Sequence, residues 1–287
     1  MEELKNIKVA LLGSGTVGTG VYKLIERQRE ELPHKVGAGL TVSKVLVRDK
    51  NKKRDGIDPS VLTDQWEDII TDDEIQIVVE VMGGIEPART YITEALQAGK
   101  NVVTANKDLM AEHGGELLDI ASHNGCDLLF EASVAGGIPI IRPLKQCLAG
   151  NYISEAMGIV NGTTNFILTK MTHEGMEFDE ALALATELGY AEADPTADIE
   201  GHDACRKIAI LTSLVCGQQV DFQDIHTEGI TKITATDIKY AKALGRSIKL
   251  LASSYKTGDS YCALVAPFML APEHPLYNVN DVFNAVF

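Results

Sequence analysis

Asp203 and Lys207 are the pair of residues in this sequence best suited to chemistry. They are four positions apart in a helix predicted to begin near His202, so they share one stripe, which continues with Ile210 and Leu214. A lysine held by a carboxylate can donate a proton to an oxygen that gains negative charge. An isolated pair of this kind is often only a surface ion pair of little energetic value. The apolar continuation of the stripe favours a polar pocket instead.

An acidic loop precedes this helix and adds negative charge beside it. Gly189, Gly201 and an Asp-Pro turn mark the segment as a loop. Its carboxylates are Glu192, Asp194, Asp198 and Glu200. The loop and the helix together predict a polar site in the second half of the chain.

Lys107 is a second cationic candidate. It follows the apolar run 101–104, so it lies near the carboxyl end of a predicted strand. Open α/β sheets bind ligands outside those carboxyl ends. A lysine there can reach the nicotinamide of a bound dinucleotide. The alternative is a lysine at a helix start that faces water.

The pattern G-x-G-x-x-G, formed by Gly13, Gly15 and Gly18, lies between an apolar strand at 7–12 and a helical pattern. This context makes a common pattern specific for a dinucleotide. The first glycine permits a tight turn, the second admits a pyrophosphate, and the third lets helix and strand pack closely. The helix N-terminus then offers free N–H groups to the phosphates. A purely structural turn would seldom need all three glycines.

The end of the second predicted strand bears on the choice between NAD and NADP. Arg48 precedes Asp49, and further basic residues follow at 50–54. An acidic residue would accept from the 2′-hydroxyl of NAD, whereas an arginine would hold the 2′-phosphate of NADP. Arg48 favours NADP, and Asp49 leaves the choice open. The lysines can equally belong to a solvated loop.

The composition is that of a globular protein. The 287 residues are 45% hydrophobic and 23% charged. At about 100 to 200 residues per domain, two domains are expected. The net charge of -15 argues against nucleic acid and anionic membranes as partners, and it favours a small-molecule substrate. No apolar run approaches the roughly 18 residues that span a bilayer, so a soluble protein is expected.

The cysteines and the N-terminus indicate a cytoplasmic setting. Five cysteines show neither a C-x-x-C pair nor a zinc-like spacing, and an odd number leaves one unpaired. The acidic start of the chain does not resemble a signal peptide.

The first half of the chain predicts a doubly wound α/β domain of the Rossmann type, over residues 1–150. Apolar runs alternate with helical patterns, as in a parallel sheet covered on both faces. The predicted strands are 7–12, 41–47, 75–82, 101–104 and 127–130, and later helices are near 87–98, 114–123 and 139–149.

Residues 151–287 predict a second, α+β domain for substrate binding and dimerisation. Near residue 150 the alternation of apolar runs with helical patterns ends, and this change marks the boundary. The predicted strands are 153–160, 247–255 and 261–270, and the helices are near 163–174, 178–188, 202–216 and 236–244.

The stretch 185–207 resembles the signature of the homoserine dehydrogenase family. Asp198, Gly201, Asp203 and Lys207 all stand in the family's spacing. The resemblance extends over almost the whole chain, through segments 13–18, 81–84, 104–107, 131–139, 161–165, 228–230 and 237–238.

The resemblance implies the reversible reduction of L-aspartate 4-semialdehyde to L-homoserine with NAD(P)H, a step towards threonine and methionine. It implies that Lys207 donates the proton to the C4 carbonyl oxygen and that Asp203 orients it and binds substrate. Glu192 and Asp198 would bind the amino end of the substrate, and Lys107 would contact substrate and cofactor. The cofactor-binding residues it implies are Gly13, Gly15, Thr16, Val17, Gly18, Arg48, Gly83, Lys107 and Gly189.

The resemblance also implies a homodimer and a structural sodium ion. The ion would be held by Glu131 and by the main-chain carbonyls of Val134, Gly136 and Ile138. Glu131 could instead simply cap the next helix.

Two alternative functions stay open on the sequence. A cysteine-dependent semialdehyde dehydrogenase would need an activated thiol beside a base, and Cys147 and Cys205 have only His202 nearby in sequence. A cofactor-binding protein with little turnover is the other alternative. Family members continue beyond Phe287 with a further strand and often an ACT domain. The run after Pro275 is therefore expected to pair with an absent strand, and the 287-residue form to bind cofactor but turn over slowly.

Overall fold

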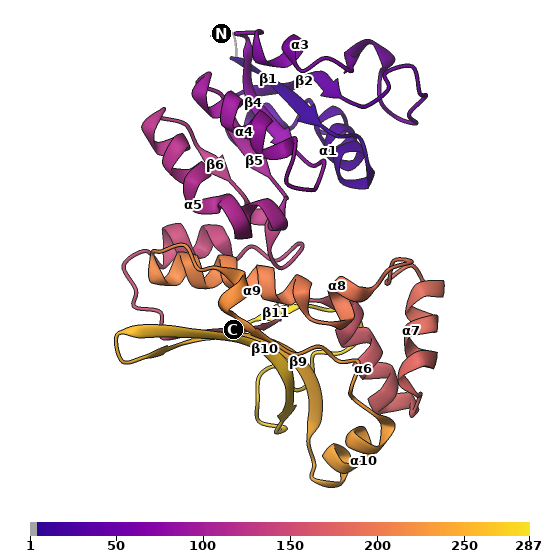
Figure 1. Ribbon diagram of the computed structural model, residues 1–287. Coiled ribbons are helices and arrows are strands. Elements are labelled where there is room, and N and C mark those ends of the chain that lie inside the picture. Colours follow the sequence, from indigo (N-terminus) through magenta and orange to yellow (C-terminus); the bar gives the residue numbers. More distant parts are fainter. Residues whose placement is uncertain (1–4) are drawn as a thin grey trace. The chain divides into compact units, whose positions relative to one another are not determined.

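The computed structural model describes residues 5–287, which form two compact units (Figure 1). The first unit ends at Phe130, and the second runs from Glu131 to Phe287. Residues 131–150 therefore group with the second unit, although the change of rhythm in the sequence placed the boundary near residue 150.

The described part of the first unit is built on a six-stranded parallel sheet in the order β3-β2-β1-β4-β5-β6. The chain leaves β1 in one direction and later returns to its other side, so the sheet is doubly wound, as predicted. The order reverses between β1 and β4. The strands are β1 (Asn6–Leu12), β2 (Gly39–Leu46), β3 (Leu62–Thr63), β4 (Ile75–Glu80), β5 (Asn101–Thr104) and β6 (Leu128–Leu129).

Helix α1 (Thr16–Arg27) covers β1 and β2 through an apolar stripe. Tyr22 and Ile25, three positions apart, are buried in one cluster with Leu11 and Val45 of the strands. This packing fixes the N-terminus of α1 at the carboxyl end of β1. The other helices of the unit are α2 (Leu32–Val36), α3 (Glu67–Ile70), α4 (Ala88–Gln97) and α5 (Lys107–His123).

The second unit contains a mixed sheet in the order β11-β7-β9-β10-β8. Its centre is the long antiparallel hairpin β9–β10, drawn in gold in Figure 1. Gly258, with φ +60°, lies in the turn of the hairpin, a conformation that glycine adopts without strain. The strands are β7 (Glu155–Ile159), β8 (His226–Thr227), β9 (Ser247–Thr257), β10 (Ser260–Leu270) and β11 (Ala285–Val286).

Helices α6, α9 and α10 pack against β9. Figure 1 shows α9 lying along the β9–β10 hairpin. An apolar cluster of Ile159, Leu251, Leu270 and Leu276 joins β7, β9 and β10 to the C-terminal segment. The helices are α6 (Gly162–Glu174), α7 (Phe178–Glu187), α8 (Thr196–Ile199), α9 (His202–Cys216) and α10 (Ala235–Ala243).

Two predictions about secondary structure were wrong. The helix expected over 139–149 is a short π-helical turn, Pro143–Cys147. Pro139 and Pro143 lack N–H groups, which interrupts a regular helix here. The run after Pro275 has its partner within the chain, because β11 pairs antiparallel with β7.

None of the helices within residues 5–287 combines the length and apolar character required to cross a membrane.

Candidate functional site

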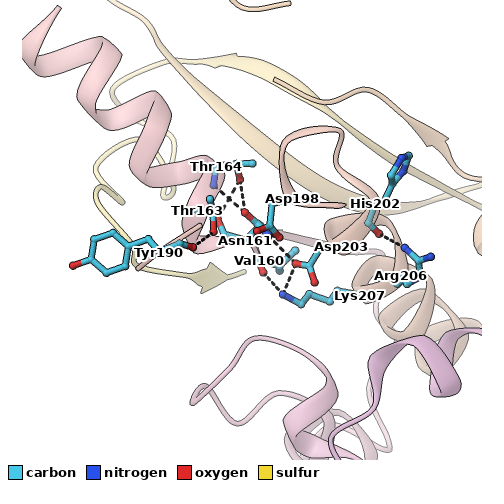
Figure 2. Close-up of polar contacts among 10 residues, drawn as sticks. All are labelled: Val160, Asn161, Thr163, Thr164, Tyr190, Asp198, His202, Asp203, Arg206 and Lys207. Carbon is cyan, nitrogen blue, oxygen red and sulfur yellow. Dashed lines mark hydrogen bonds and ion pairs between the residues drawn. The ribbon is translucent and has the colours of Figure 1, made fainter. Parts of the chain in front are cut away.

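Lys207 and Asp203 are paired on the first two turns of α9 (Figure 2). Lys207 Nζ donates to Asp203 Oδ2 at 2.6 Å, and it also donates to the main-chain oxygen of Val160 at 2.7 Å. The lysine side chain is 15% exposed and the aspartate side chain 6%. The pair is therefore mostly withdrawn from solvent, which rules out the interpretation as a surface ion pair.

Asn161 joins this pair to the acidic loop. Its Nδ2 donates to Asp198 Oδ1 at 2.7 Å and to Asp203 Oδ2 at 2.9 Å, as Figure 2 shows. Its Oδ1 caps α6 by accepting from Thr164 N. One amide thus fixes two carboxylates that lie on different elements. We call Asn161, Asp198, Asp203 and Lys207 the α9 cluster.

Asp198 is placed in this cluster by the short helix α8. The N–H of Ile230 donates to Ile199 O at 2.8 Å. A Cβ atom on Gly229 would lie 2.1 Å from the same oxygen, so only glycine lets this segment lie directly against α8. The glycine at 229 therefore helps to hold Asp198 where Asn161 can reach it.

The other carboxylates of the acidic loop do not join the cluster. Glu192 is exposed. Asp194 accepts from Thr196 N, and hydrogen bonds with the side chain and with the backbone of Thr196 lower the pKa of Asp194. Glu200 lines a separate pocket with His226 and Glu228. Of the predicted loop residues, the structure thus brings only Asp198 to the pair on α9.

Gly189 has a local role in the structure. It follows the last turn of α7 with φ +77°, the left-handed conformation that commonly ends a helix. The next residue, Tyr190, accepts a hydrogen bond from Thr163 Oγ1 at 2.7 Å and packs its ring against Phe166. These contacts tie the start of the acidic loop to α6.

In the first unit, the glycine turn has the properties that a dinucleotide site requires. Gly13 has φ +107°, and a Cβ on Gly18 would lie 2.2 Å from Gly13 O. Gly15 is exposed and has no atom within 4 Å of the place of a Cβ. No side chain caps α1, and its first turn, which begins at Thr16 and Val17, has no acidic residue. Its first N–H groups therefore face outward for an anion.

Glu80, which no sequence pattern indicated, organises the carboxyl ends of β4 and β5. Its carboxylate is fully buried and accepts from Met82 N at 2.8 Å, Gly83 N at 3.2 Å and Thr104 Oγ1 at 2.6 Å. These bonds fix the turn after β4 to the end of β5. An acidic residue inside a strand pattern carried no sign of this role in the sequence.

Lys107 is the first residue of α5, at the carboxyl end of β5, as predicted. Asn106 caps that helix through Leu109 N and donates from Nδ2 to Gly84 O at 2.7 Å. The lysine is partly buried. It therefore lies at the carboxyl ends of the parallel strands, where the glycine turn and the turn at Gly83 also lie.

Arg48 and Asp49 are both exposed just beyond β2. Arg54, a few residues further on, makes the closer contact with the glycine turn. Its Nε donates to Ser14 Oγ at 2.6 Å, and its Nη1 donates to the main-chain oxygens of Asp49 and Lys52. A guanidinium thus links the loop after β2 to the glycine turn.

Glu131 caps the segment that follows it. Its Oε1 accepts from Ile140 N at 2.6 Å and Ile141 N at 2.8 Å, and its Oε2 accepts from Arg142 N at 2.7 Å. This is the capping alternative expected from the sequence, and it explains why residues 131–150 group together. Between the cap and its partners, Ala135 and Gly136 both have positive φ.

Cys205 and Cys126 lack the properties of a nucleophile, whereas Cys147 is exposed. Cys205 is buried on α9 and donates to Phe222 O, and burial raises the pKa of its thiol. Burial also raises the pKa of Cys126. A thiol that stays protonated is a poor nucleophile, so these two residues do not support the cysteine-dependent alternative.

Comparisons with known proteins agree with this arrangement. The family model "Homoserine dehydrogenase" matches residues 139–287, and "Homoserine dehydrogenase, NAD binding domain" matches residues 13–131. The homoserine dehydrogenase of Bacillus subtilis is 50% identical over 285 residues, which are 99% of this chain and 66% of that protein.

Solved structures of homoserine dehydrogenases also match this chain. The crystal structure of a homoserine dehydrogenase from Thiobacillus denitrificans matches with a TM-score of 0.94 and 43% identity, over 98% of this chain and 65% of that one. A hyperthermophilic archaeal homoserine dehydrogenase in complex with NADPH matches with a TM-score of 0.81 and 29% identity, over 98% of this chain and 87% of that one. The chain spans 66% of the length of its Bacillus relative. It belongs to the homoserine dehydrogenase family and carries that family's NAD-binding domain.

Proposed function

We propose that the protein is an oxidoreductase that interconverts L-aspartate 4-semialdehyde and L-homoserine with NAD(P)H, in the biosynthesis of threonine and methionine. The α9 cluster carries this proposal. A largely buried lysine, fixed by a carboxylate and a main-chain oxygen, suits an aldehyde that becomes an alkoxide and then an alcohol. A bound NAD(P)H supplies the hydride.

Lys207 is the proton donor in this proposal. Its ammonium donates a proton to the C4 oxygen as negative charge develops there, and the oxygen becomes the hydroxyl of homoserine. Asp203 accepts from Lys207 and keeps the ammonium oriented towards the substrate oxygen. Asp203 and Lys207 therefore act together. Lys107 is the further residue proposed to contact substrate and cofactor.

The amino end of the substrate is bound by carboxylates. Asp198 holds a fixed position because Asn161 donates to it. Glu192 is exposed on the same loop and binds the substrate ammonium from there. Opposite charge on protein and substrate selects for an amino-acid aldehyde over a simple aldehyde.

The dinucleotide is bound by the first unit. Gly13, Gly15, Thr16, Val17 and Gly18 receive the pyrophosphate, and the open first turn of α1 supports this assignment. Arg48 binds the 2′-phosphate of NADP, which makes NADP the preferred cofactor over NAD. Gly83, Lys107 and Gly189 complete the proposed set of cofactor contacts.

A sodium ion fits the segment after Glu131. The main-chain oxygens of Val134, Gly136 and Ile138 accept no backbone hydrogen bond within residues 5–287. Carbonyl and carboxylate oxygens are the donors that a hard cation prefers. These three carbonyls and Glu131 would hold the ion, whose role would be structural.

The protein is also proposed to be a cytoplasmic homodimer. Five unpaired cysteines suit a reducing compartment. Dimerisation through the second unit follows from the family alone.

An initial-rate assay tests the proposed function. Aspartate 4-semialdehyde should be reduced with NADPH faster than with NADH. Lys207→Met should lower kcat by about 10² or more, whereas Lys242→Met, a change to an exposed lysine of α10, should leave it unchanged. Cofactor binding without any turnover would favour the alternative of a binding protein, and loss of turnover on thiol alkylation would favour the cysteine-dependent one.

A further inference from the structure

Lys249 is a buried lysine that takes no part in the α9 cluster. It lies on β9 and is 1% exposed. Its Nζ donates to three acceptors: Val279 O at 2.5 Å, Asn280 Oδ1 at 3.0 Å and Asn165 Oδ1 at 3.2 Å. An ammonium has three N–H groups, so each one has an acceptor. Two of the three acceptors belong to the C-terminal segment.

Two residues of α6 bind the same segment. Asn165 Nδ2 donates to Val279 O and Phe283 O, both at 3.2 Å. Thr169 Oγ1 accepts from Asp281 N at 3.0 Å. Asp281 has φ +53°, a strained conformation for a residue other than glycine. We call Asn165, Thr169 and Lys249 the clamp, because they hold residues 279–283 in one path against α6.

The clamped segment lies directly against the start of α6. A Cβ atom on Gly162 would lie 2.8 Å from Val282 O. Gly162 is the first residue of α6, and it follows Asn161. The clamped backbone is thus one residue away from the amide that fixes Asp198 and Asp203.

We propose that Lys249 is a positioning residue. Through the clamp it holds residues 279–283 packed against the first turn of α6, and this packing fixes Asn161 in the α9 cluster. This inference rests on the proposed function. The burial of an amine supports it, because burial lowers the pKa of Lys249 to about 8 and an apolar side chain would fill this place without that cost. Because the clamp acts through the position of Asn161, its loss should lower turnover more than it weakens cofactor binding.

The chain offers a matched pair of variants for the test. Thr169→Val removes the hydroxyl that holds Asp281, whereas the hydroxyl of Thr172, on the same helix, has no hydrogen-bond partner among the described residues. Thr172→Val is therefore the control for Thr169→Val. Lys249→Met tests the lysine itself. Asn280→Ala removes one acceptor at a partly buried position and should not impair folding.

Thr169→Val and Lys249→Met should each lower kcat for the aldehyde about tenfold or more, since small misplacements of catalytic groups are costly. The dissociation constant for NADPH should stay within about twofold, and so should every constant of Thr172→Val. Asn280→Ala should give a smaller loss of kcat in the same direction. Rescue by Lys249→Arg should restore part of kcat, because the guanidinium keeps the charge and the N–H donors.

Amide hydrogen exchange provides a readout that needs no activity. In Thr169→Val and Lys249→Met, exchange should become faster in residues 279–283 and also in 162–164. Faster exchange confined to 279–283, with kcat unchanged, would overturn the proposal. An inactive wild-type protein would refute the proposed function. The role of the clamp would then still be decided by whether exchange becomes faster in residues 162–164 together with residues 279–283.

Discussion

Lys207 donates to Asp203 one helical turn earlier on α9, at a distance of 2.6 Å. The carboxylate oxygen that accepts this bond also accepts from Asn161. The carboxylate therefore has a fixed orientation before any substrate binds. Such pre-organisation is the main way in which a protein lowers the energy of a developing charge.

Replacement of Lys207 tests its role as the proton donor. Lys207→Ala should lower kcat by about 10² to 10⁴, the usual effect of losing a positioned acid. The affinity for NADPH, measured by fluorescence titration, should hardly change. If turnover stays within a few-fold of the wild type, Lys107 becomes the better candidate.

Asn161→Ala tests the link between the two carboxylates. The substitution leaves Asp198 without its amide donor and removes the cap of α6. The free energy of unfolding should fall by about 1 to 3 kcal/mol, and kcat should fall as well. Asn151→Ala, at an exposed position in the same unit, is the control and should change neither. An unchanged kcat in Asn161→Ala would mean that the cluster keeps its geometry without the amide.

Arg48 and Arg54 should differ in their effects on the two cofactors. Arg48→Ala should raise the Michaelis constant for NADPH roughly tenfold and leave that for NADH nearly unchanged, because only NADPH carries the 2′-phosphate. Arg54→Ala should weaken both cofactors, since Arg54 holds Ser14 of the glycine turn. Equal effects of Arg48→Ala on both cofactors would remove Arg48 from the 2′-phosphate site.

Two glycines of α1 form a second matched pair. Gly18→Ala places a Cβ 2.2 Å from Gly13 O and should abolish dinucleotide binding and destabilise the first unit. Gly20→Ala meets no atom within 4 Å and should stabilise the helix by about 0.5 to 1 kcal/mol. Isothermal titration with NADPH and thermal unfolding measure both effects. Retained binding in Gly18→Ala would show that the turn can open.

Lys249 should make stability depend on pH. Its pKa is about 8 in the folded protein, below the usual 10.5, because burial disfavours the charged form. Between these values the unfolded chain binds more protons than the folded one, so stability rises with pH. Relative to Lys249→Met, the free energy of unfolding should rise by at most about 3 kcal/mol from pH 8 to 10.5. A constant difference over this range would contradict the assigned burial.

The sequence predicted the elements that have long apolar patterns. Strand β1, helix α9 and the hairpin β9–β10 were found because burial of a face or stripe sets a period in the sequence. Strands β3 and β8 were missed, since two residues alone set no period. The strand expected after Pro275 is β11, but it pairs with β7 inside the chain. The π-helical turn at Pro143 was also missed, because the N–H groups of Ile140, Ile141 and Arg142 just before it bind Glu131, which is distant in sequence.

The site was predictable where a local pattern encodes it. Asp203 and Lys207 could be paired from helical spacing, and Gly13, Gly15 and Gly18 from the turn that they form. Glu80 and Lys249 could not be found, because Thr104, which donates to Glu80, and the acceptors of Lys249 are distant in sequence. Burial of a charged group becomes visible only after the chain has folded around it.

The clamp, which holds the C-terminal segment against α6, also determines when the second unit can complete its folding during synthesis. A ribosome releases residues in order, and domains generally fold as units during synthesis. The first unit ends at Phe130 and can fold while the rest is still being made. Until residues 276–283 have left the exit tunnel, the second unit cannot complete its apolar cluster with Leu276. Nor can it form the hydrogen bond from Asp281 N to Thr169 Oγ1. A nascent chain stalled just before Leu276 would therefore bind a dinucleotide while its second unit still exposed an open core to chaperones.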